Sequence, residues 1–496
     1  MLYQSTRGSD KKVSAAEAIA QGLSENGGLY VPESFPKLDK QALNELVGMS
    51  YHERAARIIG LYLNDFSDDE VSEYARKAYS TLSFNHPAIA PLHKHDENTH
   101  VLELWHGPTS AFKDMALQML PHLVTASLKK IGEERQVCIL VATSGDTGKA
   151  ALEAFSDIPG TKIMVFYPSE GVSDVQKLQM MTQEGGNVNV VAIEGNFDDA
   201  QSGVKTIFSD ENLREKITES GFMLSSANSI NWGRLVPQVV YYVSAYCDLI
   251  NNNEIKFGEK VNFCVPTGNF GNILAAYYAL QMGLPIGKLI CASNSNDVLT
   301  EFIKSGVYDR NRQFFTTVSP SMDILISSNL ERLLFDASDR DGKMIANLMS
   351  ELGTDGRYTV DGKIKEKIDK IFVGGMCSED DTLKTISDIY KNHKYLMDTH
   401  TAVAYKVLCD YRKETGDNTK SVVVSTASPY KFCDSVLTAL GHTVSTDGAE
   451  LLDLLAQSTG TAIPAPLAGL KEKKVLFDTL ILTNDMKTEV FKFLKG

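Results

Sequence analysis

The sequence predicts an α/β protein in which helices cover parallel sheets, and three observations support this fold class. Short apolar runs alternate with helix-like segments from about residue 100 onwards, which is the pattern of repeated strand–helix–strand units. The runs are apolar almost throughout, as expected where helices cover both faces of a parallel sheet. Loops of small residues follow several runs before the next helical segment begins, and open α/β sheets bind ligands at such positions.

Residues 1–98 are predicted to form a different, mainly helical unit. The segments "SAAEAIAQGLSENG" and "DKQALNELVGMSYHERAARIIGLYL" carry apolar residues at helical spacing. Between them, "GGLYVPESFP" predicts a short extended piece and a turn. His93, His95 and His100 lie in the loop "HPAIAPLHKHDENTH" near the end of this unit. Because no pattern of acidic partners accompanies them, we expect no metal site there.

Two α/β units are expected after residue 98. The runs "QVCILVA", "KIMVFYP" and "NVNVVAIEG" predict strands of a small unit at 135–240. The runs "THVLELW", "KVNFCVPTG", "KLICASN" and "KSVVVSTAS" predict strands of a larger unit assembled from 99–134 and 241–496. Residues 305–395 are more charged and irregular, so we predict an insertion in the larger unit there.

Composition narrows the function classes. At 496 residues the chain is too long for one ordinary core, so two or three domains are expected. Lys and Arg total 49 and Asp and Glu total 63, which gives a formal charge of −14. This balance argues against a nucleic-acid partner, which would call for a basic surface. It does not exclude an anionic small substrate, because a few hydrogen-bond donors at contact distance outweigh the repulsion from the net charge of the chain.

Cysteine usage and the chain start indicate a cytoplasmic protein. The seven cysteines are scattered and never form a C-x-x-C pair, so neither a disulfide framework nor a zinc knuckle is expected. No apolar run approaches the ~18–20 residues of a membrane helix. The start "MLYQSTRGSDKK" has no signal-peptide core. We expect no membrane partner, and a monomer or homodimer.

Lys113, in the stretch "HGPTSAFKDM", is placed unusually. It follows a Gly-Pro turn signal and falls at the start of a predicted helix. The helix dipole there opposes an ammonium group and favours the neutral amine. The position is either a mildly unfavourable accident or that of a nucleophile.

The loop after the strand "VCILVA" resembles a phosphate loop only superficially. A G-x-x-x-x-G-K-[ST] motif ending at Gly148-Lys149 would need glycine at 143 and Ser or Thr at 150, where the chain has Thr143 and Ala150. A nucleotide triphosphatase is therefore not expected. What remains is a loop of small donors from Ser144 to Gly148 at a helix start, which suits a carboxylate or a phosphate but also an ordinary strand-to-helix turn.

The loop in "NFCVPTGNFGNILAAYYAL" is a second candidate for anion binding. Gly268 and Gly271 bracket a tight connection between a strand and a helix, so successive backbone N–H groups can face one anion. The pattern is not G-x-G-x-x-G, so the dinucleotide fingerprint is absent. A simple tight turn is the alternative.

Two further loops carry donors. The segment "SSANSINWGRLVPQ" combines amide and hydroxyl side chains with Arg234, and Arg is well matched to an oxyanion; a capped helix with an exposed arginine is the alternative. The loop in "VVVSTASPYKF" offers Ser425, Thr426 and Ser428 as neutral hydroxyls. A lysine at a helix start, a phosphate cradle, a carboxylate-type loop and a hydroxyl loop together indicate pyridoxal phosphate.

The segment "ELWHGPTSAFKDMALQ" closely resembles the cofactor-lysine segment of threonine synthases. The resemblance extends over almost the whole chain. Its further motifs are "YQSTRG…GLSENGGLYVPESFP", "FYPSEGVSDVQKLQMMTQEGGNVNVVAIEGNFDDAQ", "SSANSINWGRLVPQ", "PTGNFGN", "SPSMDILISSNLERLLF", "DTHTAVAY" and "STASPYKF".

This resemblance implies a fold-type-II pyridoxal 5'-phosphate enzyme that converts O-phospho-L-homoserine and water to L-threonine and phosphate. The cofactor would lie in a cleft between the two α/β units. Lys113 would form an imine with it, and Thr426 would face its ring nitrogen. The resemblance further implies cofactor-phosphate contacts from Gly268, Asn269, Phe270, Gly271 and Asn272, substrate-carboxylate contacts from Ser144, Gly145, Asp146 and Thr147, and positions near the substrate or its phosphate for Asn228, Ser229, Asn231 and Arg234.

Two other functions fit the same motifs. A threonine-synthase-like phospholyase would eliminate phosphate and release 2-oxobutyrate and ammonia. A non-catalytic, ligand-sensing relative would keep the fold as an interaction scaffold, although the intact lysine and anion loops argue against it.

Overall fold

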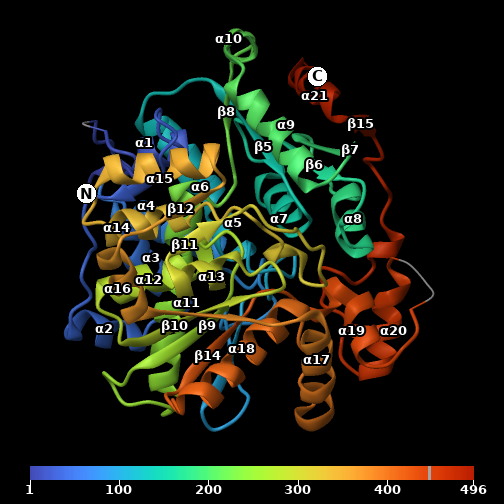
Figure 1. Ribbon diagram of the computed structural model, residues 1–496. Helices are drawn as coiled ribbons and strands as arrows, with labels where there is room; N and C mark the ends of the chain where they lie inside the picture. Colours follow the sequence, from blue (N-terminus) through green and yellow to red (C-terminus); the bar gives the residue numbers. More distant parts are fainter. Residues whose placement is uncertain (10, 445–447, 496) are drawn as a thin grey trace.

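The architecture rests on two sheets in separate lobes (Figure 1). A computed structural model describes residues 1–9, 11–444 and 448–495. One sheet has six strands in the order β13-β10-β9-β14-β4-β3, and the other has five in the order β15-β7-β6-β5-β8. The predicted α/β class is therefore confirmed. A two-stranded sheet of β1 and β2 and another of β11 and β12 complete the strand pairing in the described ranges.

The N-terminal unit is mainly helical, as predicted, with one antiparallel strand pair. Ser14 and Ser67 cap two of its helices. In each case the backbone N–H of the serine also donates to the carboxylate of a glutamate three residues later. Its elements are β1 (Tyr3–Ser5), α1 (Ala15–Gln21), β2 (Tyr30–Pro32), α2 (Lys40–Val47), α3 (Tyr51–Gly60) and α4 (Asp68–Ala78).

The six-stranded sheet is parallel except at one edge, where β3 runs antiparallel to β4. Its strands are β3 (Leu92–Lys94), β4 (Thr99–Glu103), β9 (Val261–Pro266), β10 (Ile286–Ser293), β13 (Phe372–Met376) and β14 (Ser421–Ser425). The helices of this lobe are α5 (Asp114–Leu117), α6 (Leu120–Lys130), α11 (Trp232–Asn251), α12 (Gly271–Met282), α13 (Val298–Ser305), α18 (Thr399–Thr415), α19 (Cys433–Ala439) and α20 (Glu450–Thr459), with the 3₁₀ helices η2 (Pro429–Phe432) and η3 (Leu470–Glu472).

The boundary expected at residue 98 differs from the structure, because β3 belongs to the six-stranded sheet. The insertion expected at 305–395 differs as well, because β13 lies inside that stretch and forms the other edge of the same sheet. The stretch consists of β11 (Val307–Asp309), η1 (Pro320–Met322), α14 (Leu330–Ala337), α15 (Gly342–Thr354), β12 (Arg357–Thr359), α16 (Gly362–Ile371), β13 and α17 (Glu379–His393).

The five-stranded sheet is entirely parallel. Successive residues of β5 face different cores: Val137, Ile139 and Val141 belong to the main core, whereas Cys138 and Leu140 belong to a second core under α9, α10 and α21. Burial on both faces explains the continuous apolar runs. The elements are β5 (Gln136–Ala142), α7 (Asp146–Phe155), β6 (Thr161–Pro168), α8 (Asp174–Met181), β7 (Val188–Glu194), α9 (Phe197–Ser209), α10 (Glu211–Glu219), β8 (Phe222–Ser225), β15 (Leu480–Leu482), η4 (Thr483–Asp485) and α21 (Met486–Lys495).

The C-terminal segment does not stay in the larger unit to which 241–496 was assigned. β15 pairs in parallel with β7, and α21 packs on α9 in the five-stranded lobe. Met486 and Val490 of α21 are buried in the second core. A three-residue strand whose outer leucines are about half exposed carries no pattern that identifies its sheet.

In the described ranges, no helix has the length and apolar character needed to cross a membrane.

Candidate active site

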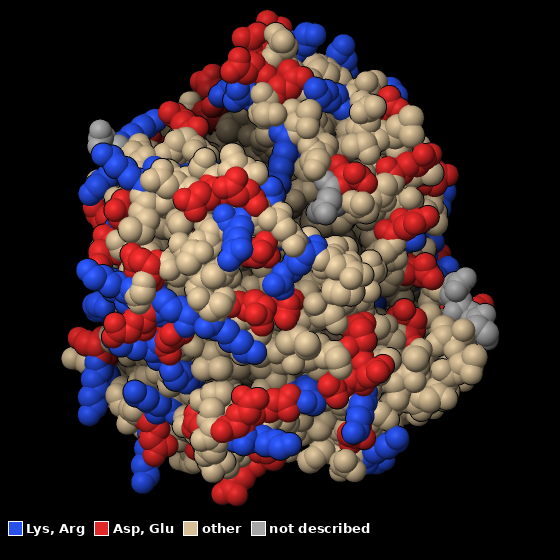
Figure 2. Space-filling view, viewed as in Figure 1, with Lys and Arg blue, Asp and Glu red and all other residues tan. Residues whose placement is uncertain are grey.

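A cavity of about 1160 Å³ brings the four strand-following loops and Lys113 together. The loops leave the ends of β5, β8, β9 and β14, where open α/β sheets bind ligands. In Figure 2 the surface is hollowed where Figure 1 has α1 on one side and β8 and α9 on the other. The predicted site residues that line the cavity are Lys113, Ser144, Asp146, Thr147, Asn228, Ser229, Arg234, Gly268, Asn269, Phe270, Gly271, Asn272 and Thr426.

The segment before α5 places Lys113 against the loop after β14. Phe112 N donates to Thr426 O over 2.8 Å, and Ser428 N donates to Ser110 O over 3.0 Å. Two loops from distant parts of the sequence are thereby joined like neighbouring strands, and Ala111 and Ala427 form a β-bridge. The lysine position is therefore fixed by the same backbone that carries Thr426.

The Lys113 side chain is chemically available. In the described ranges its Nζ takes part in no hydrogen bond or ion pair and lies 4.5 Å from the centroid of the Phe112 ring. Burial, together with the charges of Arg234 and Lys431, lowers the pKa of Lys113 to about 8, although Asp146 acts in the opposite direction. Since α5 has only four residues, burial and neighbouring charge, rather than the predicted helix dipole, account for the lowered pKa.

The loop before α12 has the form of an anion cradle. Phe270 adopts a left-handed conformation with φ 63° and begins the helix. The carbonyls of Gly268 and Asn269 accept from Ser327 Oγ over 2.7 Å and from Asn329 N over 3.2 Å. Because trans peptides point their N–H opposite to their C=O, the amides of Asn269 and Phe270 are turned away from these partners and remain for an anion.

Asn272 adds an oriented donor to this loop. Its Oδ1 accepts from the hydroxyls of Tyr241 and Tyr242 over 2.5 and 2.6 Å, which fixes the orientation of the amide. Its Nδ2 is buried and has no partner in the described part of the chain. Such an unpaired buried donor at a cavity wall fits a ligand oxygen.

At the start of α11 the predicted residues separate into two groups. Asn231 caps the helix by accepting from Gly233 N over 2.8 Å, and its Nδ2 donates to Ile19 O over 3.0 Å. Asn231 therefore holds α11 against α1 and does not line the cavity. Arg234 does line it: one guanidinium nitrogen donates to Ala227 O, while the buried Nε has no partner in the described ranges.

Burial lowers the pKa of Arg234 to about 10. Its guanidinium is thus still charged at neutral pH, and it supplies a cation to the cavity wall.

The loop between β5 and α7 is shaped by Gly145, which is absent from the cavity wall. Its φ is 135°, and a Cβ there would lie 2.5 Å from the Gln176 side chain. The side chain of Asp146 is already engaged: its Oδ1 lies 2.7 Å from Lys431 Nζ and accepts from Gln176 Nε2 over 2.8 Å. Burial raises the pKa of Asp146, but Lys431, Lys113 and the Gln176 hydrogen bond together outweigh this and bring it to about 2. A charged Asp146 side chain would repel the substrate carboxylate it was expected to contact.

Three residues of the site were not predicted from the sequence: His400, Ser321 and Lys431. His400 and Ser321 line the cavity. The Asp398 carboxylate lies 2.8 Å from His400 Nδ1, and Ser321 N donates to His400 Nε2 over 3.2 Å. Nδ1 therefore carries the proton. An available signal was Asp398 in "DTHTAVAY", because Asp is a preferred helix cap. It caps α18 and so places His400 in the first turn of that helix.

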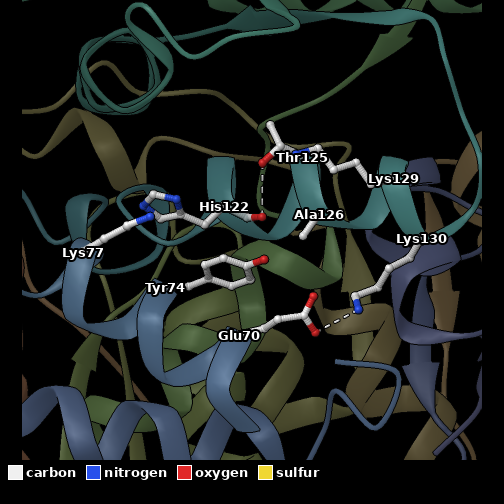
Figure 3. Close-up of a pocket in the computed structure, with 8 residues that line it drawn as sticks. All are labelled: Glu70, Tyr74, Lys77, His122, Thr125, Ala126, Lys129 and Lys130. Atoms are coloured by element: carbon white, nitrogen blue, oxygen red, sulfur yellow. Dashed lines mark hydrogen bonds and ion pairs between the residues drawn. The ribbon is translucent and has the colours of Figure 1, made fainter. Parts of the chain in front are cut away.

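A second pocket of about 460 Å³ lies between α4 and α6, and its lining shares no residue with the cavity (Figure 3). Tyr74 stacks on His122 with centroids 5.7 Å apart, and Lys130 pairs with Glu70 at 2.9 Å. These side chains satisfy one another across two helices, so we place the chemistry in the larger cavity.

The histidines near residue 98 lie outside both pockets. His93 stacks on Tyr395 with centroids 4.4 Å apart, and His95 lies 4.3 Å from the His393 ring. His100 is buried, and its pKa falls to about 4 because of that burial, although Glu254 opposes the shift.

Comparisons with known protein families cover nearly the whole chain. The model described as Threonine synthase N terminus matches residues 2–79, that of Pyridoxal-phosphate dependent enzyme matches 86–427, and that of Threonine synthase, C-terminal matches 401–487.

Individual relatives agree with the family models. Threonine synthase-like 1 of Macaca fascicularis is 44% identical over 445 residues, which are 87% of this chain and 59% of that protein; the chain thus spans about three fifths of the length of this relative. Threonine synthase of Pseudomonas aeruginosa is 38% identical over 470 residues, 94% of this chain and 97% of that protein. The crystal structure of PLP-bound threonine synthase from Brucella melitensis has a TM-score of 0.88 and 38% identity, with both chains covered completely.

Proposed function

We propose that this chain, which belongs to the threonine synthase family of pyridoxal-phosphate enzymes, converts O-phospho-L-homoserine and water to L-threonine and phosphate. The observation that carries the proposal is the meeting of an unpaired Lys113 with the anion cradle before α12 in one cavity. This is the set of groups that pyridoxal phosphate needs: an amine for covalent attachment and fixed donors for its phosphate.

The donors at the cavity wall suit the cofactor, because several of them have no partner in the described ranges. The amides of Asn269 and Phe270, the start of α12 and the unpaired Nδ2 of Asn272 would hold its phosphate. Thr426 offers a neutral hydroxyl, suited to the ring nitrogen. When bound, pyridoxal phosphate withdraws electrons from the amino-acid carbons next to the amine and so makes their protons removable.

Lys113 would have a second role whenever it is not attached to the cofactor. With a pKa near 8, roughly a tenth to a fifth of its amine is neutral at physiological pH, so it can accept a proton at the substrate Cα and return protons to later carbons of the substrate. A lysine with an ordinary pKa near 10.5 would be protonated almost completely and could not act as a base.

The two anionic groups of the substrate would be bound by different loops of the cavity wall. The hydroxyls of Ser144 and Thr147 and the amides at the start of α7 suit the carboxylate. Arg234, with Asn228 and Ser229 beside it on the wall, suits the phosphate that leaves. Gly145 and Asn231 shape these segments without lining the cavity.

Product analysis tests the proposal. Purified protein loaded with cofactor is incubated with O-phospho-L-homoserine, and threonine, phosphate and 2-oxobutyrate are resolved. Threonine and phosphate in equal amounts are expected. Phosphate accompanied by 2-oxobutyrate would identify a phospholyase instead. Absence of phosphate release from the loaded protein would refute both activities and leave a non-catalytic ligand-binding role.

We further propose that the enzyme works in the cytoplasm as a monomer or homodimer. All seven cysteines are unpaired and six of them are buried, which fits a reducing compartment. Light scattering with size-exclusion chromatography gives the subunit number, and a mass beyond that of two chains would contradict this part of the proposal.

A further inference from the structure

A buried ion pair connects the two lobes at the cavity wall. Lys431 lies in η2 of the six-stranded lobe, and Asp146 begins α7 of the five-stranded lobe. Lys431 Nζ and Asp146 Oδ1 are 2.7 Å apart, and the side chains are 0% and 4% exposed. A pair this well buried is costly to form unless further hydrogen bonds satisfy both groups.

Those further bonds are present. Lys431 Nζ also donates to Thr109 O over 3.1 Å, and its backbone carbonyl accepts from Ser173 Oγ, the cap of α8, over 3.2 Å. The Asp146 carboxylate also accepts from Gln176 Nε2 over 2.8 Å and, through Oδ2, from Ser321 Oγ over 3.4 Å. The position of each charged group is thus fixed from both lobes.

Asp146 and Lys113 line the same cavity, and each acts electrostatically on the other. An ionised carboxylate beside a lysine normally pairs with it and keeps it protonated. Here Oδ1 of the carboxylate is committed to Lys431, while Lys113 has no ion pair in the described part of the chain.

We propose that Lys431 is a positioning residue of this site: its ammonium group engages the Asp146 carboxylate and thereby leaves the Lys113 amine unpaired for cofactor and substrate. The inference rests on the proposed function for its biological meaning. Its physical content, the competition of two lysines for one carboxylate, is independent of which product the enzyme releases.

The direction of each charge effect follows from the groups around Lys113. Arg234 and Lys431 lower its pKa, and Asp146 raises it. Loss of the Lys431 charge removes one lowering effect and frees Asp146 to pair with Lys113, so both consequences raise the pKa of Lys113. Loss of the Asp146 charge does the reverse. The other titratable side chains at the cavity wall are Glu25, Arg135, Lys205, Arg214, Asp323 and His400, and buried Asp114 follows Lys113 in the chain.

The experiment measures the Lys113 amine directly in the full-length apoprotein. Reaction with a trace of 1-fluoro-2,4-dinitrobenzene over a series of pH values, followed by mass spectrometry of the Lys113 peptide, gives the pH at which half of the amine is neutral. We expect a midpoint near 8 in the wild type. Lys431→Met should raise it by about one unit or more, Lys431→Arg should leave it close to the wild type, and Asp146→Asn should lower it.

Lys149→Met is the matched control. Lys149 is another buried lysine, on α7, where it pairs with Glu153 at 2.8 Å, and it does not line the cavity. This variant should leave the Lys113 midpoint unchanged. An unchanged midpoint in folded Lys431→Met, judged by circular dichroism, would overturn the proposal.

Asp146→Asn keeps the test decisive if Lys431→Met does not fold. An unshifted midpoint in Asp146→Asn would then show that this carboxylate does not act on Lys113, which also overturns the proposal. Labelling needs neither cofactor nor substrate, so the Lys113 midpoint can be interpreted even if the protein lacks the proposed activity. The product assay tests that activity separately.

Discussion

The reactivity of Lys113 depends on what surrounds a single amine. The backbone of 110–112 is hydrogen-bonded to the loop after β14, which fixes the lysine at a buried position. Burial and two neighbouring cations bring its pKa to about 8. A side chain that would otherwise be permanently charged becomes a nucleophile and base at neutral pH.

Replacement of Lys113 by Ala should abolish covalent attachment of the cofactor and reduce turnover at least about a thousandfold, because both the attachment point and the base are lost. Absorbance of the loaded protein and the product assay measure the two effects. In the wild type, the rate of covalent loading should rise as the pH is raised through about 8, since only the neutral amine reacts.

Lys129→Ala is the control for this variant, because Lys129 is exposed on α6 and lies outside the cavity. It should retain full activity. Near-normal turnover of Lys113→Ala would rule out the assigned role.

Arg234→Ala should raise the Michaelis constant for phospho-homoserine about 10- to 100-fold, since a charge-assisted bond contributes about 1.5–3 kcal/mol. Cofactor affinity should change far less, because the cradle before α12 does not involve Arg234. Arg234→Lys keeps the charge without the planar fork, so its Michaelis constant should lie between those of the wild type and Arg234→Ala. An unchanged Michaelis constant for Arg234→Ala would assign the residue a structural role.

All the predicted site residues except Gly145 and Asn231 line the cavity. Loop position and residue type indicated Lys113 and the anion loops, and the roles of single residues came from the family resemblance. Asn231 departed from expectation because, among the polar residues of "SSANSINW", geometry alone decides which one caps α11. Lys431 was missed because its partner, Asp146, lies 285 positions earlier (431 − 146) in the other lobe. Pairings over such separations depend on the tertiary fold and leave no local pattern.

Among the elements, the loop before α12 shows why one glycine is needed where a neighbouring one is not. A Cβ on Gly268 would lie 2.6 Å from Ser321 O, a backbone atom that cannot swing aside. A Cβ on Gly271 would come no closer than 3.4 Å to its nearest neighbour, an Asn329 side-chain atom. The cradle and the 319–322 segment are therefore packed against each other through Gly268.

Gly268→Ala should weaken cofactor binding about tenfold to a hundredfold, because overpacking costs about 1–3 kcal/mol and displaces the amides that hold the phosphate. Gly271→Ala should bind nearly as well as the wild type. Titration of each apoprotein with pyridoxal phosphate measures the two dissociation constants, and equal affinities would exclude the close approach as the reason for the glycine.

The edge strand β13 was not recognised in the sequence, and its composition is unusual for a strand. Its sequence "FVGGM" contains two glycines, which normally weaken a strand. It lies within 305–395, which was predicted to be an insertion because that stretch is charged and irregular. In the structure, a Cβ on Gly375 would lie 2.5 Å from Val407 of α18, and one on Gly374 would lie 2.9 Å from the backbone of α13. The glycines permit two helices to pack closely on the strand.

Gly375→Ala should therefore lower the free energy of unfolding by about 1–3 kcal/mol. Gly362→Ala, at the first position of α16, adds a Cβ to open space and should be neutral or mildly stabilising, by up to about 1 kcal/mol. Urea unfolding of the two variants makes the comparison. Equal stability of the two would remove the packing explanation for β13.

For the whole molecule, the chain visits the five-stranded lobe twice. Residues 136–225 provide four of its strands. The chain then forms most of the other lobe, and β15 and α21 near its end add the last strand and a covering helix to the five-stranded lobe. The helical N-terminal unit was predictable from apolar periodicity. Continuous apolar runs made the strands β4, β5, β6, β7, β9, β10 and β14 predictable. The return of the chain to the five-stranded lobe was not predictable, because the pairing of a three-residue strand depends on which edge is open in the finished fold.

Val490→Ala in α21 should destabilise the five-stranded lobe by about 2 kcal/mol, because Val490 is fully buried in the second core. Hydrogen exchange of β6 and β7 should accelerate, while β9 and β14 are unaffected. Lys492→Ala, on the same helix and largely exposed, should stay within about 0.5 kcal/mol of the wild type. Uniform acceleration in both lobes would show that they unfold as one unit.

The late arrival of β15 also sets a constraint on biosynthesis. On a ribosome, β5, β6 and β7 emerge long before the last residues of the chain, so the outer edge of β7 and the apolar face later covered by α21 stay open through most of translation. Open strand edges and apolar faces are the surfaces through which nascent chains aggregate. A chain stalled on the ribosome near residue 475 would therefore already contain most residues of the cavity wall but would lack β15 and α21. Its five-stranded lobe would be incomplete, and we expect chaperones to bind such chains.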